Sequence, residues 1–359
     1  MKKITLVILA NICMVIASKA NPTLSFFNEM KSPALVQLFK DTSVIDNLQK
    51  LHAQVRMGIL DLTDERAKVV RDLNNAGVPV FAWLLLPEEK GYWFNSGNGQ
   101  EAIARYKEIK QWADHHKLQF SGIGLDLELD YNDAKLIKTN PWKLIAKIPA
   151  RLFDKSELEK GRKEYATLIS LIKADNYPVE SYYAGFIKDE VSLQQTAIQQ
   201  ASKFLDIKTD KEIPMLYSSF MGNADGLIKI YGIDLNLEAV ALGSTGGGVD
   251  TTLPTLSYEQ LVHDINVAAK QSTEIHIFSL EGCVQKGYLT KLVDYTYDST
   301  VVLDPRQIKS VSKLQMTVKR VSTILSYPVT FFTVIILLIV LLIWLIYILL
   351  RFIIRKLIG

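Results

Sequence analysis

The sequence predicts an α/β fold of the (β/α)8 TIM-barrel type, and three observations support this fold class. Short runs rich in β-branched and aromatic residues alternate with amphipathic segments from residue 34 to residue 297. Eight such runs and eight such segments fill about 260 residues, which is the usual size of this barrel. The competing fold, a doubly wound open sheet, lacks its glycine fingerprint, because residues 39–42 contain no glycine.

Each element follows from its local pattern. The β-rich runs predict strands at residues 34–39, 55–60, 78–86, 120–128, 179–184, 213–219, 239–242 and 275–280. The amphipathic segments predict helices at residues 44–52, 64–76, 99–117, 157–174, 189–205, 224–231, 258–271 and 284–294. Strands that alternate with helices form parallel βαβ units, so the barrel domain is expected at residues 34–300, after a lead-in at 21–33.

The N-terminal residues have the pattern of a secretory signal peptide. Lys2 and Lys3 precede an apolar run at residues 4–17, and small residues two positions apart follow it. The run is too short to cross about 30 Å of hydrocarbon at roughly 1.5 Å per residue. We therefore expect a signal peptide at residues 1–20, cleaved after Ala20, and export of the remaining chain.

The C-terminal region has the length and composition of a transmembrane helix. Residues 329–350 are almost wholly apolar, and a short tail at 351–359 carries three basic residues. The polar, basic segment 301–328 is expected to be a juxtamembrane stalk. Because basic residues flank the span on both sides, we take the orientation from the signal peptide. The sequence thus predicts a single-pass membrane protein with a cytoplasmic tail and a periplasmic or cell-surface barrel.

Composition excludes several classes of protein. The chain has 41 basic and 38 acidic residues, a formal net charge of +3, which gives no reason to expect a nucleic-acid partner. Two cysteines exclude a disulfide framework and a cysteine-rich zinc site. The five histidines show no metal-ligand spacing. No cofactor is expected, and the sequence indicates no particular oligomeric state.

The predicted fourth strand carries the strongest signal for chemistry. Alternate residues of a strand face the same side, so Gly122, Gly124, Asp126 and Glu128 share one face. The two glycines leave space inside the barrel for another side chain. The two acids have Cα atoms about 7 Å apart and lie at the end of the strand where barrel enzymes place their active sites.

Two carboxyl groups this close do not both ionise easily, so one of them keeps a proton. Cleavage of a glycosidic bond needs such a general acid. We therefore predict that Glu128 is the general acid and Asp126 its electrostatic partner. The alternatives are that the acids bind a metal, pair with a buried cation or cap the next helix.

Gly122, Asp126 and Glu128 also match three positions of the pattern Asp-Gly-x-Asp-x-Asp-x-Glu. This segment resembles the fourth-strand signature of glycoside hydrolase family 18, the chitinase-like barrels, with Glu128 at the proton-donor position. Ser121 and Gly124 occupy the positions of the first two aspartates.

Two further segments resemble motifs of the same family. Residues 215–218 are similar to Met-x-Tyr-Asp, and Tyr217 matches the tyrosine that holds the reacting acetamido group. Residues 278–282 are similar to Trp-Ser-Leu-Asp-Gly, and Phe278 replaces the tryptophan that floors the sugar site. The resemblance implies attack by the substrate's own acetamido group and hence an N-acetylated glycan.

Other candidate site residues follow the second and eighth strands. Asp61 and Glu281 could each be a second carboxylate near Glu128, or each could begin the helix that follows. A carboxylate about 5 Å from Glu128 would allow a retaining mechanism, and one at about 6.5–9.5 Å an inverting mechanism.

Aromatic residues gather near the end of the third strand. Trp83, Tyr92 and Trp93 could form a sugar platform together with Phe278, since flat rings stack on the apolar faces of sugars. Alternatively, they could pack under the loop as a small cluster. The glycine-rich residues 243–248 predict a lid or a loop that approaches other backbone closely.

These patterns together predict an exported, membrane-tethered barrel that resembles a glycoside hydrolase and acts on a carbohydrate substrate. The alternative is a non-catalytic carbohydrate-binding or surface-interaction barrel. The sequence does not specify the glycan, or whether the mechanism is retaining, inverting or substrate-assisted.

Overall fold

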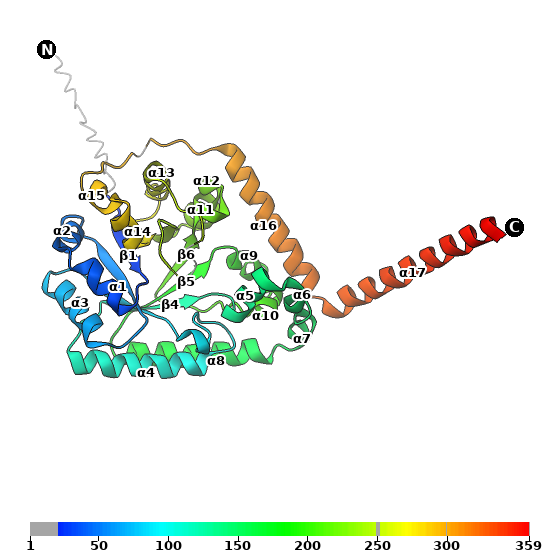
Figure 1. Ribbon diagram of the computed structural model, residues 1–359, viewed down its shortest axis with the longest axis horizontal. Helices are drawn as coiled ribbons and strands as arrows, with labels where there is room; N and C mark the ends of the chain where they lie inside the picture. The colour runs from blue at the N-terminus through cyan, green and yellow to red at the C-terminus, as the bar shows by residue number, and fades with distance from the viewer. Residues whose placement is uncertain (1–20, 249–251, 299, 359) are drawn as a thin grey trace, which may run out of the picture.

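The computed structural model describes residues 21–248, 252–298 and 300–358. Within them, eight parallel strands close into one barrel in the order β1 to β8, and β8 pairs with β1. Helices surround the barrel (Figure 1). The prediction of a TIM barrel is therefore confirmed. The predicted signal peptide at residues 1–20 lies outside the described residues.

The strands are five or six residues long. They are β1 Thr23–Asn28, β2 Gln54–Ile59, β3 Val80–Leu84, β4 Gly122–Leu127, β5 Val179–Ala184, β6 Lys211–Leu216, β7 Ala239–Gly243 and β8 Glu274–Phe278.

The helices vary from single turns to a rod of 31 residues. In chain order, the α-helices are α1 Ser32–Phe39, α2 Thr42–Lys50, α3 Asp64–Asn75, α4 Gly99–His116, α5 Tyr131–Thr139, α6 Pro141–Ile145, α7 Ile148–Phe153, α8 Ser156–Ala174, α9 Ile187–Val191, α10 Ala197–Ser202, α11 Ser218–Met221, α12 Ala224–Ile228, α13 Tyr258–Ala268, α14 Leu280–Gln285, α15 Tyr288–Val293, α16 Pro305–Leu325 and α17 Pro328–Ile358. A 3-10 helix at Glu88–Lys90 and a π-helix at Lys229–Ile233 complete the set.

The prediction for the first strand was wrong. Residues 34–39 lie in α1, and the strand is Thr23–Asn28, inside the segment expected to be a lead-in. Pro33 stands in the first turn of α1, where its missing N–H costs no hydrogen bond. The barrel therefore begins at Thr23 rather than at residue 34, and the residue that follows its first strand is Glu29.

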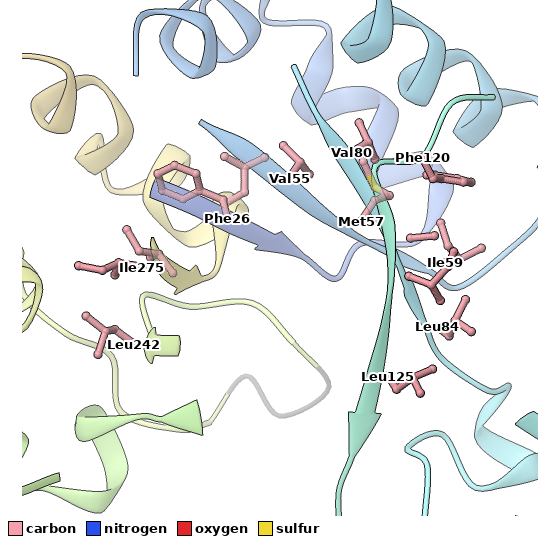
Figure 2. Packing of buried hydrophobic residues seen from close by; sticks show 14 of the residues in the cluster. Phe26, Val55, Met57, Ile59, Val80, Leu84, Phe120, Leu125, Leu242 and Ile275 are labelled. Atoms are coloured by element: carbon pink, nitrogen blue, oxygen red, sulfur yellow. The ribbon is translucent and has the colours of Figure 1, made fainter. Parts of the chain in front are cut away.

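The main hydrophobic core fills the space between the strands and the helices around them. Outward-facing side chains such as Phe26, Met57, Leu125 and Ile275 are fully or almost fully buried there (Figure 2). Because their neighbours in sequence point into the barrel, each strand is buried on both sides, as expected for a parallel sheet.

The interior of the barrel is polar at its amino-terminal end. The fully buried Arg56 guanidinium donates to the two Glu180 carboxylate oxygens at 2.9 and 3.0 Å, and to Glu274 Oε1 at 2.6 Å. Above this layer, Tyr182 points inward and donates its hydroxyl hydrogen to Glu180. These bonds satisfy charges that would otherwise be costly to bury.

Gly124 makes room for Tyr182. A Cβ atom at Gly124 would lie 2.7 Å from the Tyr182 ring carbons Cε2 and Cζ, which is closer than real Cβ contacts come. The expectation that this glycine leaves space inside the barrel for another side chain is therefore confirmed.

Helix α16 lies within the segment expected to be a juxtamembrane stalk, and it packs along the barrel. Its Gln315 donates to Asp189 Oδ1 at 2.7 Å and its Ser322 to Glu190 Oε1 at 2.8 Å. Near its start, Gln307 accepts a hydrogen bond from the backbone N–H of Asp225 at 3.1 Å. Helix α16 is thus held against the barrel by hydrogen bonds to the buried side chains of Asp189 and Glu190 and to the backbone of Asp225.

Helix α17 projects away from the barrel (Figure 1). Its segment Pro328–Lys356 is long enough to cross a membrane, and the most apolar 18 residues of this segment have a mean hydropathy of 3.3 and are not buried. The predicted span at residues 329–350 lies within it. A fully exposed apolar helix of this length is not expected in water.

Candidate functional site

The carboxyl end of β4 carries the acid pair that the sequence singled out. Asp126 is the last inward-facing residue of the strand, and Glu128 follows one residue after the strand ends. The loop after β3 fixes this end, because the Phe94 N–H donates to the Asp126 carbonyl at 2.8 Å and the Glu128 N–H to the Phe94 carbonyl at 3.0 Å. The two carboxyl groups share a hydrogen bond.

The pair retains a proton near neutral pH. Burial, followed by the charges of Glu128 and Glu29, raises the pKa of Asp126 well above its usual value. Burial also raises the pKa of Glu128 to about 7, although the hydrogen bond from Asp126 lowers it. Asp126 is only 1% exposed, whereas Glu128 is half-buried, so Glu128 is the member of the pair that faces solvent.

Trp83 lies beside Asp126 within the barrel. Its indole N–H lowers the pKa of Asp126, yet neither Trp83 Nε1 nor Asp126 Oδ1 has a hydrogen-bond partner of good geometry. We interpret the pair as close neighbours whose donor and acceptor are imperfectly aligned. A buried acceptor in this condition is available to a ligand or to water.

Glu29 adds a third carboxylate that sequence reasoning missed. It follows β1, accepts a hydrogen bond from the Tyr92 hydroxyl and is half-buried. Its charge raises the pKa values of Asp126 and Tyr217, so it lies near both. The sequence does carry a signal for this residue, because Glu29 directly follows a run that alternates inward and outward residues. The pattern at residues 34–39, however, predicts the first strand further along the chain.

Tyr217 converges with the acid pair. It follows β6, is half-buried, and has its pKa raised well above its usual value by burial and by the charges of Asp126, Glu128 and Glu29. The phenol therefore stays protonated at neutral pH and can donate a hydrogen bond. Its ring centroid lies 5.6 Å from that of Phe278.

The predicted aromatic platform is only partly accessible. Trp83 and Tyr92 are each 4% exposed, whereas Trp93 and Phe278 are half-buried. Tyr92 and Trp93 contact one another and Tyr131, with ring centroids 5.2–5.7 Å apart, so the packed cluster considered as the alternative is present. The ring faces that a sugar could reach are therefore those of Trp93 and Phe278.

Asp61 is committed to the scaffold. It accepts hydrogen bonds from Arg66 Nε at 3.0 Å and Nη2 at 2.9 Å, and from Ser32 and Thr63. Burial by itself would raise the pKa of Asp61, but the hydrogen bonds from Arg66 and Ser32 outweigh burial and lower this pKa. The cap of α3 is Thr63, not Asp61. We therefore leave Asp61 out of the candidate site.

Glu281 lies next to the site, in the first turn of α14. It accepts from the Asn28 side chain at 2.9 Å and from the Glu29 backbone N–H at 3.1 Å. Burial raises the pKa of Glu281 to about 7. Both of its oxygens contact the residues that end β1, so it positions Glu29. Ser279, not Glu281, caps α14.

The glycine-rich loop after β7 crosses this region. A Cβ atom at Gly248 would lie 2.9 Å from both Glu29 Oε2 and Phe278 Cζ, and one at Gly247 would lie 2.8 Å from Glu281 Cγ. This is the close approach expected for the loop. Among the described residues, no group of three or more histidine, cysteine and acidic side chains could hold a metal ion.

Comparisons with known proteins give the following results. No family model matches the chain. No curated protein matches it either.

Several solved structures resemble the chain. They include a 3-keto-D-glucoside 4-epimerase from E. coli (13% identity, TM-score 0.42, covering 76% of this chain and 98% of that one). A Rhizomucor miehei β-1,3-glucanosyltransferase in complex with laminaritriose has 13% identity and a TM-score of 0.36, covering 72% of this chain and 86% of that one. A putative α-L-fucosidase from Bacteroides thetaiotaomicron has 9% identity and a TM-score of 0.42, covering 81% and 98%. At these values the likenesses carry no argument about chemistry.

Proposed function

We propose that this protein is an exported, membrane-anchored glycoside hydrolase that cleaves a glycosidic bond in an N-acetylated glycan. The observation that carries the proposal is the hydrogen-bonded pair of Asp126 and Glu128 at the carboxyl end of β4, beside Tyr217. A half-exposed carboxyl group with a pKa of about 7, beside a buried one that keeps its own proton, forms the acid that this reaction requires.

In the proposed mechanism, Glu128 gives its proton to the glycosidic oxygen as the bond from that oxygen to the anomeric carbon breaks. The acetamido oxygen of the sugar forms a new bond to the same carbon, as the family resemblance implies. Water then attacks this carbon while the bond from the carbon to the acetamido oxygen breaks. The ionised Glu128 takes a proton from that water, so the acetamido group and the carboxyl group are both restored. Each step balances without a cofactor.

The neighbours of Glu128 have defined parts in this proposal. Asp126 donates to Glu128 and stabilises its charge after the proton has left. Tyr217 remains protonated and donates to the acetamido group. Trp93 and Phe278 offer half-buried ring faces to the sugar. Glu29 places negative charge where an oxocarbenium-like transition state would develop positive charge.

The test is the substitution Glu128→Gln, assayed by the release of reducing ends from a panel of N-acetylated polysaccharides. We expect a loss of roughly 10²–10⁴-fold in turnover with little change in binding. Glu159→Gln, at an exposed position of α8, is the matched control and should leave turnover unchanged. Equal turnover by the Glu128→Gln variant and the unaltered protein would refute the proposal.

A second candidate function, carbohydrate binding without catalysis, is favoured by one observation. Ser218 occupies the position of an aspartate in the family motif, and its buried hydroxyl donates to Asp264 Oδ2 at 2.5 Å, a bond to the α13 scaffold. Binding of an N-acetylated oligosaccharide by the unaltered protein, without any release of reducing ends, would select this function.

A further inference from the structure

The segment between β4 and α8 forms three short helices with an apolar outer surface. Its helices α5, α6 and α7 expose Ile137 (54%), Trp142 (77%), Ile145 (50%) and Phe153 (57%). Large apolar side chains that gather at this exposure mark a contact with another protein or with a membrane. None of these residues belongs to the candidate site.

This surface adjoins the start of the candidate membrane span. The ring of Phe153 in α7 lies 5.8 Å from the ring of Phe332 in α17, centroid to centroid. Helices α6 and α7 lie beside the junction of α16 and α17 (Figure 1). The last turn of α16 and the residues after it add Ile324 (52% exposed) and Tyr327 (64% exposed) to the same region.

An apolar cavity lies between this segment and α16. Its volume is about 320 Å³, and its lining is almost wholly apolar, with contributions from both sides. Residues that line it include Leu129, Ile137, Leu144, Ile148, Val318 and Val321. An open apolar cavity next to exposed apolar side chains is unfavourable in water, but not at a hydrocarbon boundary.

The segment is also basic. Residues 131–155 contain six lysines and arginines and two aspartates. One aspartate, Asp133, is buried and bonds to Lys147 at 2.9 Å and to Arg151 at 2.5 Å. Lys143 and Lys155 are exposed beside the apolar side chains. Amphipathic helices with this mixture of aromatic, aliphatic and basic residues bind anionic membrane surfaces.

We propose that α5–α7 and the end of α16 form a membrane-contact surface, which lies in the headgroup region of the anionic bilayer that holds α17. The occupant is this bilayer, because the surface is continuous with the span through Phe153 and Phe332. Trp142 and Tyr327 then take the interfacial positions that aromatic side chains prefer. The inference rests on the membrane anchor of the proposed function, but not on its catalysis.

The experiment uses the full chain in liposomes of phosphatidylcholine alone or with phosphatidylglycerol. Cys13 is replaced by alanine, whereas Cys283 is buried and does not compete for a thiol label. A single cysteine is then introduced for a fluorescent label, and the test variant is Trp142→Cys. The matched control is Lys68→Cys, on the exposed face of α3, and Leu345→Cys reports on the span itself. Spin-labelled lipids quench a label that contacts the bilayer.

We expect several-fold stronger quenching and a blue-shifted emission at position 142 relative to position 68, more so with phosphatidylglycerol. Equal, water-like emission at 142 and 68, with strong quenching at 345, would overturn the surface but leave the anchor. No quenching at 345 would overturn the anchor and this inference together, while the hydrolase activity stays open to its own test.

A charge variant gives a second readout. Lys143→Glu combined with Lys155→Glu should remove the effect of phosphatidylglycerol on the label at 142, because only the headgroup attraction is lost. The same variant should hydrolyse glycan in detergent at the unaltered rate. An undiminished effect of phosphatidylglycerol would count against the electrostatic part of the proposal.

Discussion

At Glu128, a half-exposed carboxyl group is hydrogen-bonded to one that is closed to water, and this predicts the pH dependence of the reaction. Since burial raises the pKa of Glu128 to about 7, the protonated acid is present below pH 7 and is lost above it. We expect kcat/KM to fall about tenfold per pH unit above this value. A pH profile that stays flat from pH 6 to pH 9 would contradict the assignment of Glu128 as the acid.

The same pKa shift predicts a conflict between stability and function. The pKa of the Glu128 carboxyl group is near 4.5 in the unfolded chain and about 7 in the folded protein. The contribution of this group to stability is therefore fully present below pH 4.5 and is lost as the pH rises through about 7. Glu128→Gln should therefore match the unaltered protein at pH 4 and exceed its free energy of unfolding by roughly 1–2 kcal/mol at pH 8. Chemical denaturation at both pH values measures this, and a less stable variant at pH 8 would oppose it.

At the scale of the element, β4 and β5 depend on each other through Gly124 and Tyr182. Gly124→Ala should destabilise the barrel by about 1–3 kcal/mol, because the new methyl group meets a ring that is held by Glu180. Removing the Tyr182 hydroxyl frees the ring from that hydrogen bond. Thermal denaturation of Gly124→Ala, Tyr182→Phe and the double variant should therefore show coupling, and strictly additive effects would argue against the contact.

Elements with a strong local pattern were predictable from the sequence, and those decided by tertiary contacts were not. The acid pair on β4 was found because alternation along one strand fixes its shared face. The first strand was predicted at the wrong place because the apolar residues of 34–39 fit a short strand as well as a helix, although Pro33 is typical of the first turn of a helix. Asp61 could not be assigned, because Ser32, one of its partners, lies at the start of α1 and is distant in sequence.

At the scale of the whole molecule, α16 belongs to the barrel and α17 does not. Helix α16 donates hydrogen bonds to the carboxylates of Asp189 and Glu190 and accepts one from the backbone N–H of Asp225, and its Val311 is 2% exposed. The main contacts of helix α17 are with α16 and α7, and its side chains are exposed over most of its length. The boundary between the folded domain and the candidate membrane span therefore lies near Tyr327.

This boundary predicts two truncations with opposite outcomes. A chain that ends at Tyr327 should lose membrane association but keep the melting temperature of the barrel, because few contacts are removed. A chain that ends at Leu303 loses α16, leaves Asp189 and Glu190 without their α16 partners, and uncovers the surface beneath Val311. Its melting temperature should be lower by roughly 5–15 °C, measured by circular dichroism. Equal melting temperatures for the two chains would show that α16 is a separable stalk after all, and would remove the reason for placing the barrel directly against the bilayer.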